Sequence, residues 1–299
     1  MPTEPIKPYN VSCIAQLSPF RYPGGKTWFV PYVRQWLQSI EPKPRILVEP
    51  FAGGAIVGLT AAGENLVERV ILVEKDERVA AVWKTILNGS GAWLASRIVD
   101  FDFTPEAVKA ELAKATETRR EKAFQTLLRN RVSRGGLLAP GSGLLNKGEG
   151  EKGLGSRWYP ITLQRRILQI VEAKDRIEVR KTDGMRVMRE FAKRGDVAFF
   201  IDPPYTAAAR NRFYSHAEIN HSALFKLVSR IKGHFLLMYD SSEQVHGFAK
   251  KHQFDTRVIL MKNTHNMEMQ ELLIGRDLSW IDRKEPHDEH EQELPLATL

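Results

Sequence analysis

The sequence predicts an α/β protein with a doubly wound, mostly parallel sheet, and two observations predict this class. Short apolar runs alternate with stretches in which apolar residues recur at helical spacing. This alternation is typical of parallel strands that are joined by helices. Several of the apolar runs also end at an acidic residue or a glycine turn, and the ligands of such sheets bind beyond the carboxyl ends of the strands.

The N-terminal part predicts two strands, each followed by a helix. The apolar residues after the first turn fall three and four positions apart, and a proline in the first helical turn is tolerated there. In order, we expect a turn at 21–26, a helix at 28–40, a strand at 45–49, a glycine turn at 50–54, a helix at 55–62, a strand at 69–73 and a helix at 78–87.

The pattern changes at about Trp93, where we expect an inserted unit of helices and loops. Thr104 and Pro105 are typical of a helix start, because threonine caps the first N–H groups and proline suits the first helical position. The segment 135–155 holds eight of the chain's 21 glycines and is predicted to be a mobile loop or hairpin. The helices expected in this unit are 106–115, 119–132 and 161–173.

The remaining sequence predicts the rest of the sheet. The last two strands are expected to form an antiparallel hairpin at the sheet edge. The elements are strands 177–181 and 197–201, helix 222–232, strand 235–239, helix 243–252, and strands 256–261 and 268–274. We therefore predict a catalytic domain formed by 14–92 and 174–280, an inserted domain at 93–173, and a flexible polar and acidic tail at 281–299.

Composition and charge narrow the classes of function. The 299 residues carry a net charge of +8, and the segment 118–166 alone holds eleven Lys and Arg against three Glu. Such a segment favours a polyanionic partner, although a solvated helix face followed by a flexible linker is the alternative. One cysteine, Cys13, excludes an internal disulfide framework, and the isolated histidines predict no metal site. Without a signal peptide or a long apolar run, we expect a cytoplasmic protein, associated with the nucleoid and not with a membrane.

The string Asp202-Pro203-Pro204-Tyr205 directly follows the predicted strand 197–201 and carries the clearest chemistry. Successive prolines stiffen the chain, so the Asp202 carboxylate and the Pro203 carbonyl are left as two acceptors. Accepting both protons of an aromatic NH₂ group favours the localised lone pair that attacks a methyl sulfonium, and Tyr205 would stack on the base. A proline-rich turn that only ends a strand is the alternative.

Four predicted strand ends bring polar groups to the same edge of the sheet. Gly53 and Gly54 would let the backbone approach a ligand, and Glu74, one strand later, suits a ribose diol. The sequence has no Gly-x-Gly-x-x-Gly or Walker motif, which disfavours a phosphate-bound nucleotide but not a sulfonium nucleoside. A tight turn at the glycines, and solvated helix-start acids at Glu74 and Asp183, remain as alternatives.

Three separated motifs, in the same order, resemble those of the Dam-like, D12 class of N6-adenine DNA methyltransferases. Arg21-Tyr22-Pro23-Gly24-Gly25-Lys26 resembles the N-terminal cofactor motif of this family, 49–55 its Phe-x-Gly-x-Gly loop, and 202–205 its catalytic motif. The basic insertion between the cofactor and catalytic motifs corresponds to the α-type order. Tyr22 replaces the commoner Trp, Ala55 a Gly and Glu74 an Asp. The glycine-rich hairpin departs further, so a recognition sequence such as GATC does not carry over.

The resemblance implies an S-adenosylmethionine-dependent enzyme that methylates N6 of a flipped-out adenine in double-stranded DNA. A cognate restriction endonuclease would be a functional partner, and we expect a monomer or weak dimer. One alternative is methylation of cytosine N4 or of RNA. Another is a DNA-binding protein that keeps an inactive methyltransferase scaffold, and in such a protein we would expect broken cofactor motifs.

The expected catalytic residues are Asp202, Pro203, Pro204 and Tyr205. The expected cofactor contacts are Tyr22, Pro23, Gly24, Lys26, Glu49, Pro50, Phe51, Gly53, Glu74, Asp183, Gly184 and Asp202. The expected DNA contacts are Arg21, Arg129, Asn130, Arg131, Arg134, Lys147, Lys152 and Arg157.

Overall fold

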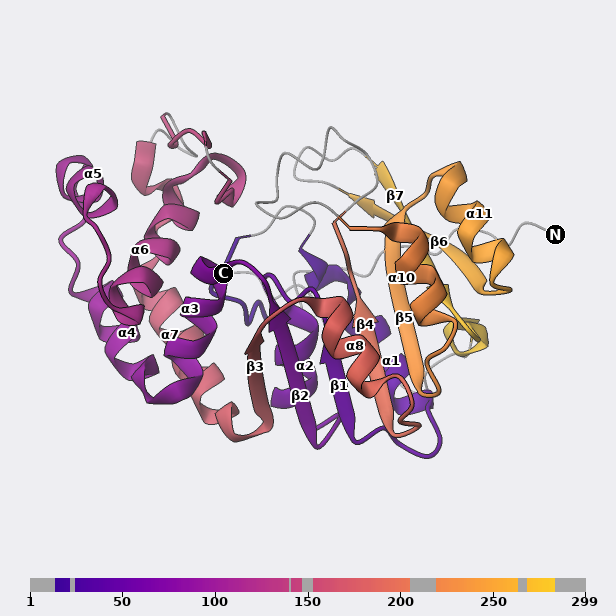
Figure 1. Ribbon diagram of the computed structural model, residues 1–299. Coiled ribbons are helices and arrows are strands. Elements are labelled where there is room, and N and C mark those ends of the chain that lie inside the picture. Colours follow the sequence, from indigo (N-terminus) through magenta and orange to yellow (C-terminus); the bar gives the residue numbers. More distant parts are fainter. Residues whose placement is uncertain are drawn as a thin grey trace, which may run out of the picture.

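A seven-stranded sheet with helices on both faces forms the centre of the protein, as a computed structural model shows (Figure 1). The structure describes residues 14–21, 25–139, 141–146, 153–204, 219–262 and 268–282. The strand order is β3-β2-β1-β4-β5-β7-β6. The strands are β1 (Ile46–Glu49), β2 (Arg69–Glu74), β3 (Ile177–Lys181), β4 (Val197–Ile201), β5 (His234–Asp240), β6 (Asp255–Lys262) and β7 (Glu268–Gly275). The predicted fold class is confirmed.

Strands β1 to β5 are parallel, and the last two strands reverse direction. β7 pairs antiparallel with β5, from Leu236 opposite Gly275 to Asp240 opposite Glu271. β6 pairs only with β7 and forms the edge, so the predicted hairpin is confirmed and its second strand takes the inner position. The chain order reverses between β1 and β4, and sheets of this kind bind their ligands in a crevice at the carboxyl ends of the strands beside such a reversal. We call this expected ligand region the crevice.

The two faces of the sheet bury separate apolar clusters because successive strand residues point to opposite sides. Leu47 and Phe200 face the cluster covered by α1 (Val30–Ser39), α2 (Ile56–Gly63) and α3 (Glu77–Thr85). Val48 and Phe199 face the cluster covered by α8 (Gly184–Phe191), α10 (His221–Val228) and α11 (Glu243–Lys251). Helix α10 ends before the predicted 232, since the N–H of Lys232 bonds to the carbonyl of Ala192.

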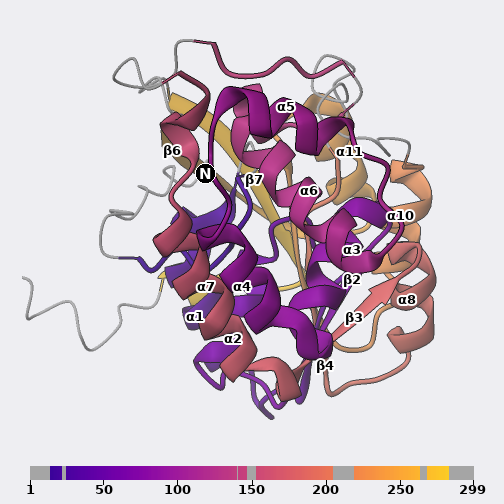
Figure 2. The ribbon, with the colours of Figure 1, turned by 90° about the vertical axis from the view of Figure 1, so that its left-hand side faces the viewer.

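The inserted region lies beside α3 and the β3 edge of the sheet, and Figure 2 shows its helices together. α6 (Arg119–Val132) packs on α3, and α7 (Pro160–Glu172) packs on α4 (Gly91–Val99), while α5 (Pro105–Ala113) lies against α6. A reciprocal capping box of Thr118 and Glu121 fixes the start of α6 where the sequence predicts it. The apolar side chains of α4, α6 and α7 belong to the cluster that covers the first sheet face. The division into domains stays a prediction.

Helices α4 and α8 were not predicted from the sequence. Both begin at a glycine, and α4 follows the segment 86–90, in which Asn88 and Gly89 have non-helical backbone angles. Glycine and asparagine favour turns in a sequence, whereas here tertiary packing of Leu94 and Met188 outweighs that preference. In the described ranges, no helix has both the length and the apolar character that crossing a membrane requires.

Candidate active site

The glycine turn after β1 is held on both sides by side chains from the next strand and helix. The N–H of Gly53 donates to Oε2 of Glu74 at 3.0 Å, and Nε1 of Trp83 donates to the carbonyl of Gly53 at 3.0 Å. Gly53 has a φ of +44°, a conformation that glycine adopts without strain. Ala55 also has a positive φ, of 52°, at the position where the resemblance leads one to expect glycine. The turn is therefore rigid before any ligand binds.

Glu49, at the carboxyl end of β1, is buried and points back under the glycine turn. Its Oε2 accepts a hydrogen bond of 2.8 Å from the N–H of Gly58 in α2. The pKa of Glu49 is raised to about 8. Burial is the main cause, the nearby charge of Asp202 contributes to the rise, and the hydrogen bond from Gly58 opposes it. A carboxyl group with such a pKa is largely protonated at neutral pH, and an arriving positive charge would favour its ionised form.

Glu74, at the carboxyl end of β2, uses both carboxylate oxygens to hold backbone. Oε2 accepts from Gly53, and Oε1 accepts from the N–H of Asp76 at 2.8 Å. The pKa of Glu74 is raised to about 7. Burial is the main cause and the neighbouring charge of Asp76 contributes, whereas the hydrogen bonds that the Glu74 carboxylate accepts from backbone N–H groups lower the pKa. Glu74 thus joins the glycine turn to the start of α3, and each oxygen retains a lone pair for a ligand hydroxyl.

The segment after β3 packs closely against the turn after β1. A Cβ added at Gly184 would lie 2.1 Å from the carbonyl oxygen of Pro50, so only glycine allows this approach. Asp183 caps α8, with Oδ1 accepting from the N–H of Arg186 at 3.2 Å, and its side chain is exposed. Phe51 is half-buried next to this contact, at the edge of the cluster under α8.

Asp202 follows β4 directly and faces the same crevice from the other side. Its Oδ2 lies 3.0 Å from Nζ of Lys26, and its side chain retains 25% exposure. Lys26 is buried at the start of the short helix η2 (Lys26–Phe29), although the sequence placed it only as a cofactor contact. Pro203 and Pro204 are buried, which fixes the backbone beyond Asp202. Tyr205 lies outside the described residues, as do Tyr22, Pro23 and Gly24.

Glu271 was missed by the sequence-based reasoning. It lies in β7 with 3% exposure, and its Oε2 is 3.4 Å from Nζ of Lys26. The signal was weak: Glu271 follows Gln270 and directly precedes the apolar run 272–274, and a charged residue that becomes buried needs a partner. Lys26 therefore lies between two carboxylates that come from different strands.

Arg21 is fixed by Asn130, near the end of α6. The amide oxygen of Asn130 accepts from the N–H of Arg21 at 2.8 Å, and its Nδ2 donates to the carbonyls of Arg21 at 2.8 Å and Gly136 at 2.6 Å. A Cβ at Gly136 would lie 2.5 Å from the carbonyl of Arg21, and its φ is +73°. The insertion thus holds the first residue of the N-terminal motif.

Two of the expected DNA contacts, Asn130 and Arg131, are buried in the structure. Asn130 has 0% exposure and Arg131 is buried, with its Nη2 donating to the carbonyl of Pro19 at 2.6 Å. Burial, together with neighbouring arginines, lowers the pKa of Arg131. Both side chains are engaged with the backbone of 19–21, so they position this segment. Arg134 is exposed, and Arg21, Arg129 and Arg157 are half-buried, whereas Lys147 and Lys152 lie outside the described residues.

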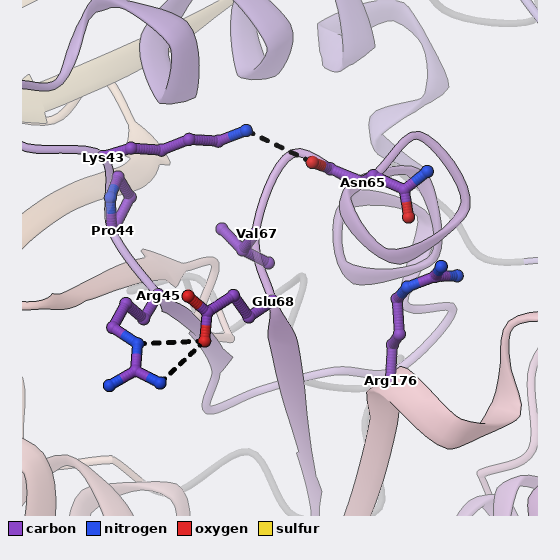
Figure 3. Close-up of a pocket in the computed structure, with 7 residues that line it drawn as sticks. All are labelled: Lys43, Pro44, Arg45, Asn65, Val67, Glu68 and Arg176. Carbon is purple, nitrogen blue, oxygen red and sulfur yellow. Dashed lines mark hydrogen bonds and ion pairs between the residues drawn. The ribbon is translucent and has the colours of Figure 1, made fainter.

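A cavity of about 250 Å³ lies at the opposite end of the strands (Figure 3). Lys43, Arg45, Glu68 and Arg176 line it, and Arg45 and Glu68 directly precede β1 and β2. Because ligands of such sheets bind at the carboxyl ends, we do not assign the active site to this cavity. Within the described ranges, no group of three or more His, Cys, Asp or Glu is placed to hold a metal ion.

Solved structures of other methyltransferases are similar to the chain at low identity. A putative RNA methyltransferase from Pyrococcus horikoshii is 13% identical, with 86% of this chain and 84% of that one covered and a TM-score of 0.38. The rRNA methyltransferase aviRa from Streptomyces viridochromogenes is 11% identical, with 86% and 87% covered and a TM-score of 0.38. A precorrin-6y C5,15-methyltransferase from Geobacter metallireducens GS-15 is 10% identical, with 83% and 86% covered and a TM-score of 0.36.

Comparison with curated proteins gave no significant match. The family model of the D12 class N6 adenine-specific DNA methyltransferases matches residues 22–267, which is most of the chain. This range contains the glycine turn, Glu74, the insertion and the Asp202 loop. The chain therefore belongs to the D12 class N6 adenine-specific DNA methyltransferase family and is a methyltransferase.

Proposed function

We propose that the protein transfers the methyl group of S-adenosylmethionine to N6 of an adenine that is flipped out of duplex DNA. The observation that carries the proposal is the position of Asp202. It follows β4 at the crevice beside β1 and directly precedes two buried prolines, and its Oδ2 is held by Lys26. Lys26 thereby fixes the Asp202 side chain, and its other carboxylate oxygen, Oδ1, can accept a hydrogen bond from a target amine.

The residues on the β1 and β2 side of the crevice fit the methyl donor. Glu74 is held so that its oxygens face the glycine turn, as binding a ribose diol requires. Gly53 has a positive φ and no Cβ, so a nucleoside could approach the backbone of the turn closely, and Gly184 allows the start of α8 to pack against Pro50. Asp202 adds negative charge, which complements a sulfonium, and the positive charge of the donor would favour the ionised form of Glu49. When bound, this donor supplies an electrophilic methyl group, which passes to the N6 lone pair as the carbon–sulfur bond breaks, and N6 then loses a proton.

The chain's own groups orient the attacking nitrogen and add nothing covalent to it. Asp202 accepts a hydrogen bond from the amine, which makes its lone pair more available for in-line attack. The Pro203 carbonyl is the expected second acceptor, and Tyr205 the expected stacking partner. The basic residues of the insertion would hold the phosphates that flank the flipped base.

Mapping methylated bases in duplex DNA exposed to the protein and S-adenosylmethionine tests the proposal. We expect N6-methyladenine within a defined flanking sequence, and none with Asp202→Ala, which should keep the fold. Methylation at cytosine N4, or of RNA in place of DNA, would contradict the proposed substrate. Full activity of Asp202→Ala would contradict the assigned role of this carboxylate.

A further inference from the structure

A buried carboxylate from the antiparallel part of the sheet reaches the ammonium group that contacts Asp202. Lys26 has 4% exposure and Glu271 has 3%. Nζ of Lys26 is 3.0 Å from Oδ2 of Asp202 and 3.4 Å from Oε2 of Glu271. The three groups come from η2, from the end of β4 and from β7, which are distant in the sequence and are brought together by the sheet order.

The two carboxylates differ in their surroundings. Asp202 keeps a quarter of its side chain exposed, whereas Glu271 has 3% exposure and lies in β7, between β5 and β6. Removing two such charges from water costs several kcal/mol per ion and is offset only by well-placed partners. A buried ammonium with Asp202 as its single anion would draw that carboxylate inward. Glu271 supplies a second anion on the protein side, so Lys26 can support Asp202 without withdrawing it from the crevice.

We propose that Glu271 is a positioning residue for methyl transfer. It holds the Lys26 ammonium against Oδ2 of Asp202 and so fixes the Asp202 carboxylate with its other oxygen toward the target amine. This inference rests on the proposed function. Glu271 itself touches neither substrate, so its removal should reduce kcat and leave the binding of both substrates nearly unchanged.

The test compares the steady-state kinetics of Glu271→Gln with those of Glu178→Gln, both measured with purified full-length protein, duplex DNA and S-adenosylmethionine. Glu178 is a matched control because it is a half-buried strand carboxylate that pairs with Arg69 and Arg180, away from the crevice. We expect Glu271→Gln to lower kcat about 10- to 100-fold, the effect of a misplaced catalytic group, with KM for DNA and donor affinity changed less than about threefold. Glu178→Gln should keep the wild-type kcat.

A double-variant cycle shows whether Glu271 acts through Lys26. If it does, Lys26→Gln combined with Glu271→Gln should be no slower than Lys26→Gln alone. Rate losses that multiply, or a wild-type kcat in Glu271→Gln, would overturn the inference. If Glu271→Gln does not fold, Glu271→Asp gives the same test: a reduced kcat with unchanged donor affinity supports the positioning role, and a wild-type kcat overturns it.

The proposed function and this inference can fail separately. An active wild-type enzyme with an active Glu271→Gln variant would overturn the positioning role alone. An inactive wild-type enzyme, with correctly folded protein and DNA of all sequence contexts, would overturn the proposed function and the positioning role with it.

Discussion

Oε2 of Glu49 accepts a hydrogen bond of 2.8 Å from the backbone N–H of Gly58, which joins the end of β1 to the helix after the glycine turn. A Cβ at Gly58 would lie 2.7 Å from that oxygen and 2.6 Å from Leu72, so the helix approaches the strand only because residue 58 is glycine. The bond holds the buried Glu49 carboxyl group next to the crevice, so a positive charge that binds in the crevice would favour ionisation of this group.

Replacing Glu49 with Gln should change how stability depends on pH. The pKa of Glu49 is raised from 4.5 to about 8, so the folded state favours the protonated form. The stability that this group contributes is complete below about pH 4.5 and is lost as the pH rises toward 8, at about 1.4 kcal/mol per pH unit at most. Gln keeps an acceptor for Gly58 without titrating. We therefore expect the free energy of unfolding of the wild type to fall relative to that of Glu49→Gln across this range.

Chemical unfolding at several pH values, without ligand, measures this difference. Glu74, with its pKa raised to about 7, titrates in an overlapping window but is present in both proteins, so it cancels in the comparison. If the two proteins lose stability in parallel between pH 4.5 and 8, the raised pKa of Glu49 is wrong.

The strands and most helices could be predicted because their signals are local. β3 and β4 have the bounds that their apolar runs indicate, and α6 begins at its capping box. The acids at strand ends were also visible, since each directly follows an apolar run. What the sequence does not contain is the partner of each charge. Lys26 and Glu271 are 245 positions apart, and only the position of β7 between β5 and β6 brings them together.

The insertion shows the same limit for burial. The expectation that Asn130 and Arg131 contact DNA followed from the family resemblance and the basic character of the insertion, and neither of these shows which side chains are buried. Whether a polar side chain faces outward depends on which backbone groups lie nearby. Here the segment 19–21 crosses the end of α6 and presents its N–H and carbonyl groups to these two residues. No periodicity of α6 encodes a contact with a segment more than 100 residues away.

Asn130→Ala should destabilise the protein and weaken binding of the methyl donor without any direct contact to it. The change leaves the N–H and carbonyl of Arg21 and the carbonyl of Gly136 without their buried partner, which costs about 2 to 4 kcal/mol in total. Because Arg21 is the first residue of the N-terminal motif, the motif loses its anchor. Chemical unfolding and calorimetric titration with S-adenosylmethionine measure the two effects.

Arg134→Ala is the control for Asn130→Ala, since Arg134 is exposed near the same helix end. It should change neither stability nor donor affinity. Donor affinity that survives in a folded Asn130→Ala protein would show that the anchor on Arg21 does not support the cofactor site.

Loss of single arginines from the insertion should reduce the salt dependence of DNA binding. Arg157 is half-buried near Arg21 and Arg131, where a phosphate would compensate clustered positive charge, and Arg134 is exposed just beyond the end of α6. Each Ala variant should lower the slope of log affinity against log salt by about 1, as expected for one lost phosphate contact. Fluorescence anisotropy with a labelled duplex measures the slope.

Arg176→Ala is the matched control for these slopes. Arg176 is an exposed arginine at the opposite end of the strands, where it lines the cavity of Figure 3. Its removal changes the net charge equally, so the slope should stay as in the wild type. Equal slopes for all three variants would mean that DNA responds to total charge and does not contact the insertion at Arg134 and Arg157. The same experiment with Lys147→Ala and Lys152→Ala tests the two lysines expected from the sequence.

Gly184→Ala should separate α8 from the turn after β1, because its Cβ would meet the Pro50 carbonyl at 2.1 Å and backbone has to move. Overpacking of this kind costs about 1 to 3 kcal/mol, and here the displaced backbone borders the expected nucleoside site. We therefore expect a lower unfolding free energy together with weaker donor binding. Gly247→Ala, inside α11 with open space around its Cβ, is the control and should stabilise the protein by about 0.5 to 1 kcal/mol. If both substitutions shift stability in the same direction and leave donor affinity unchanged, the contact between α8 and Pro50 does not shape the cofactor site.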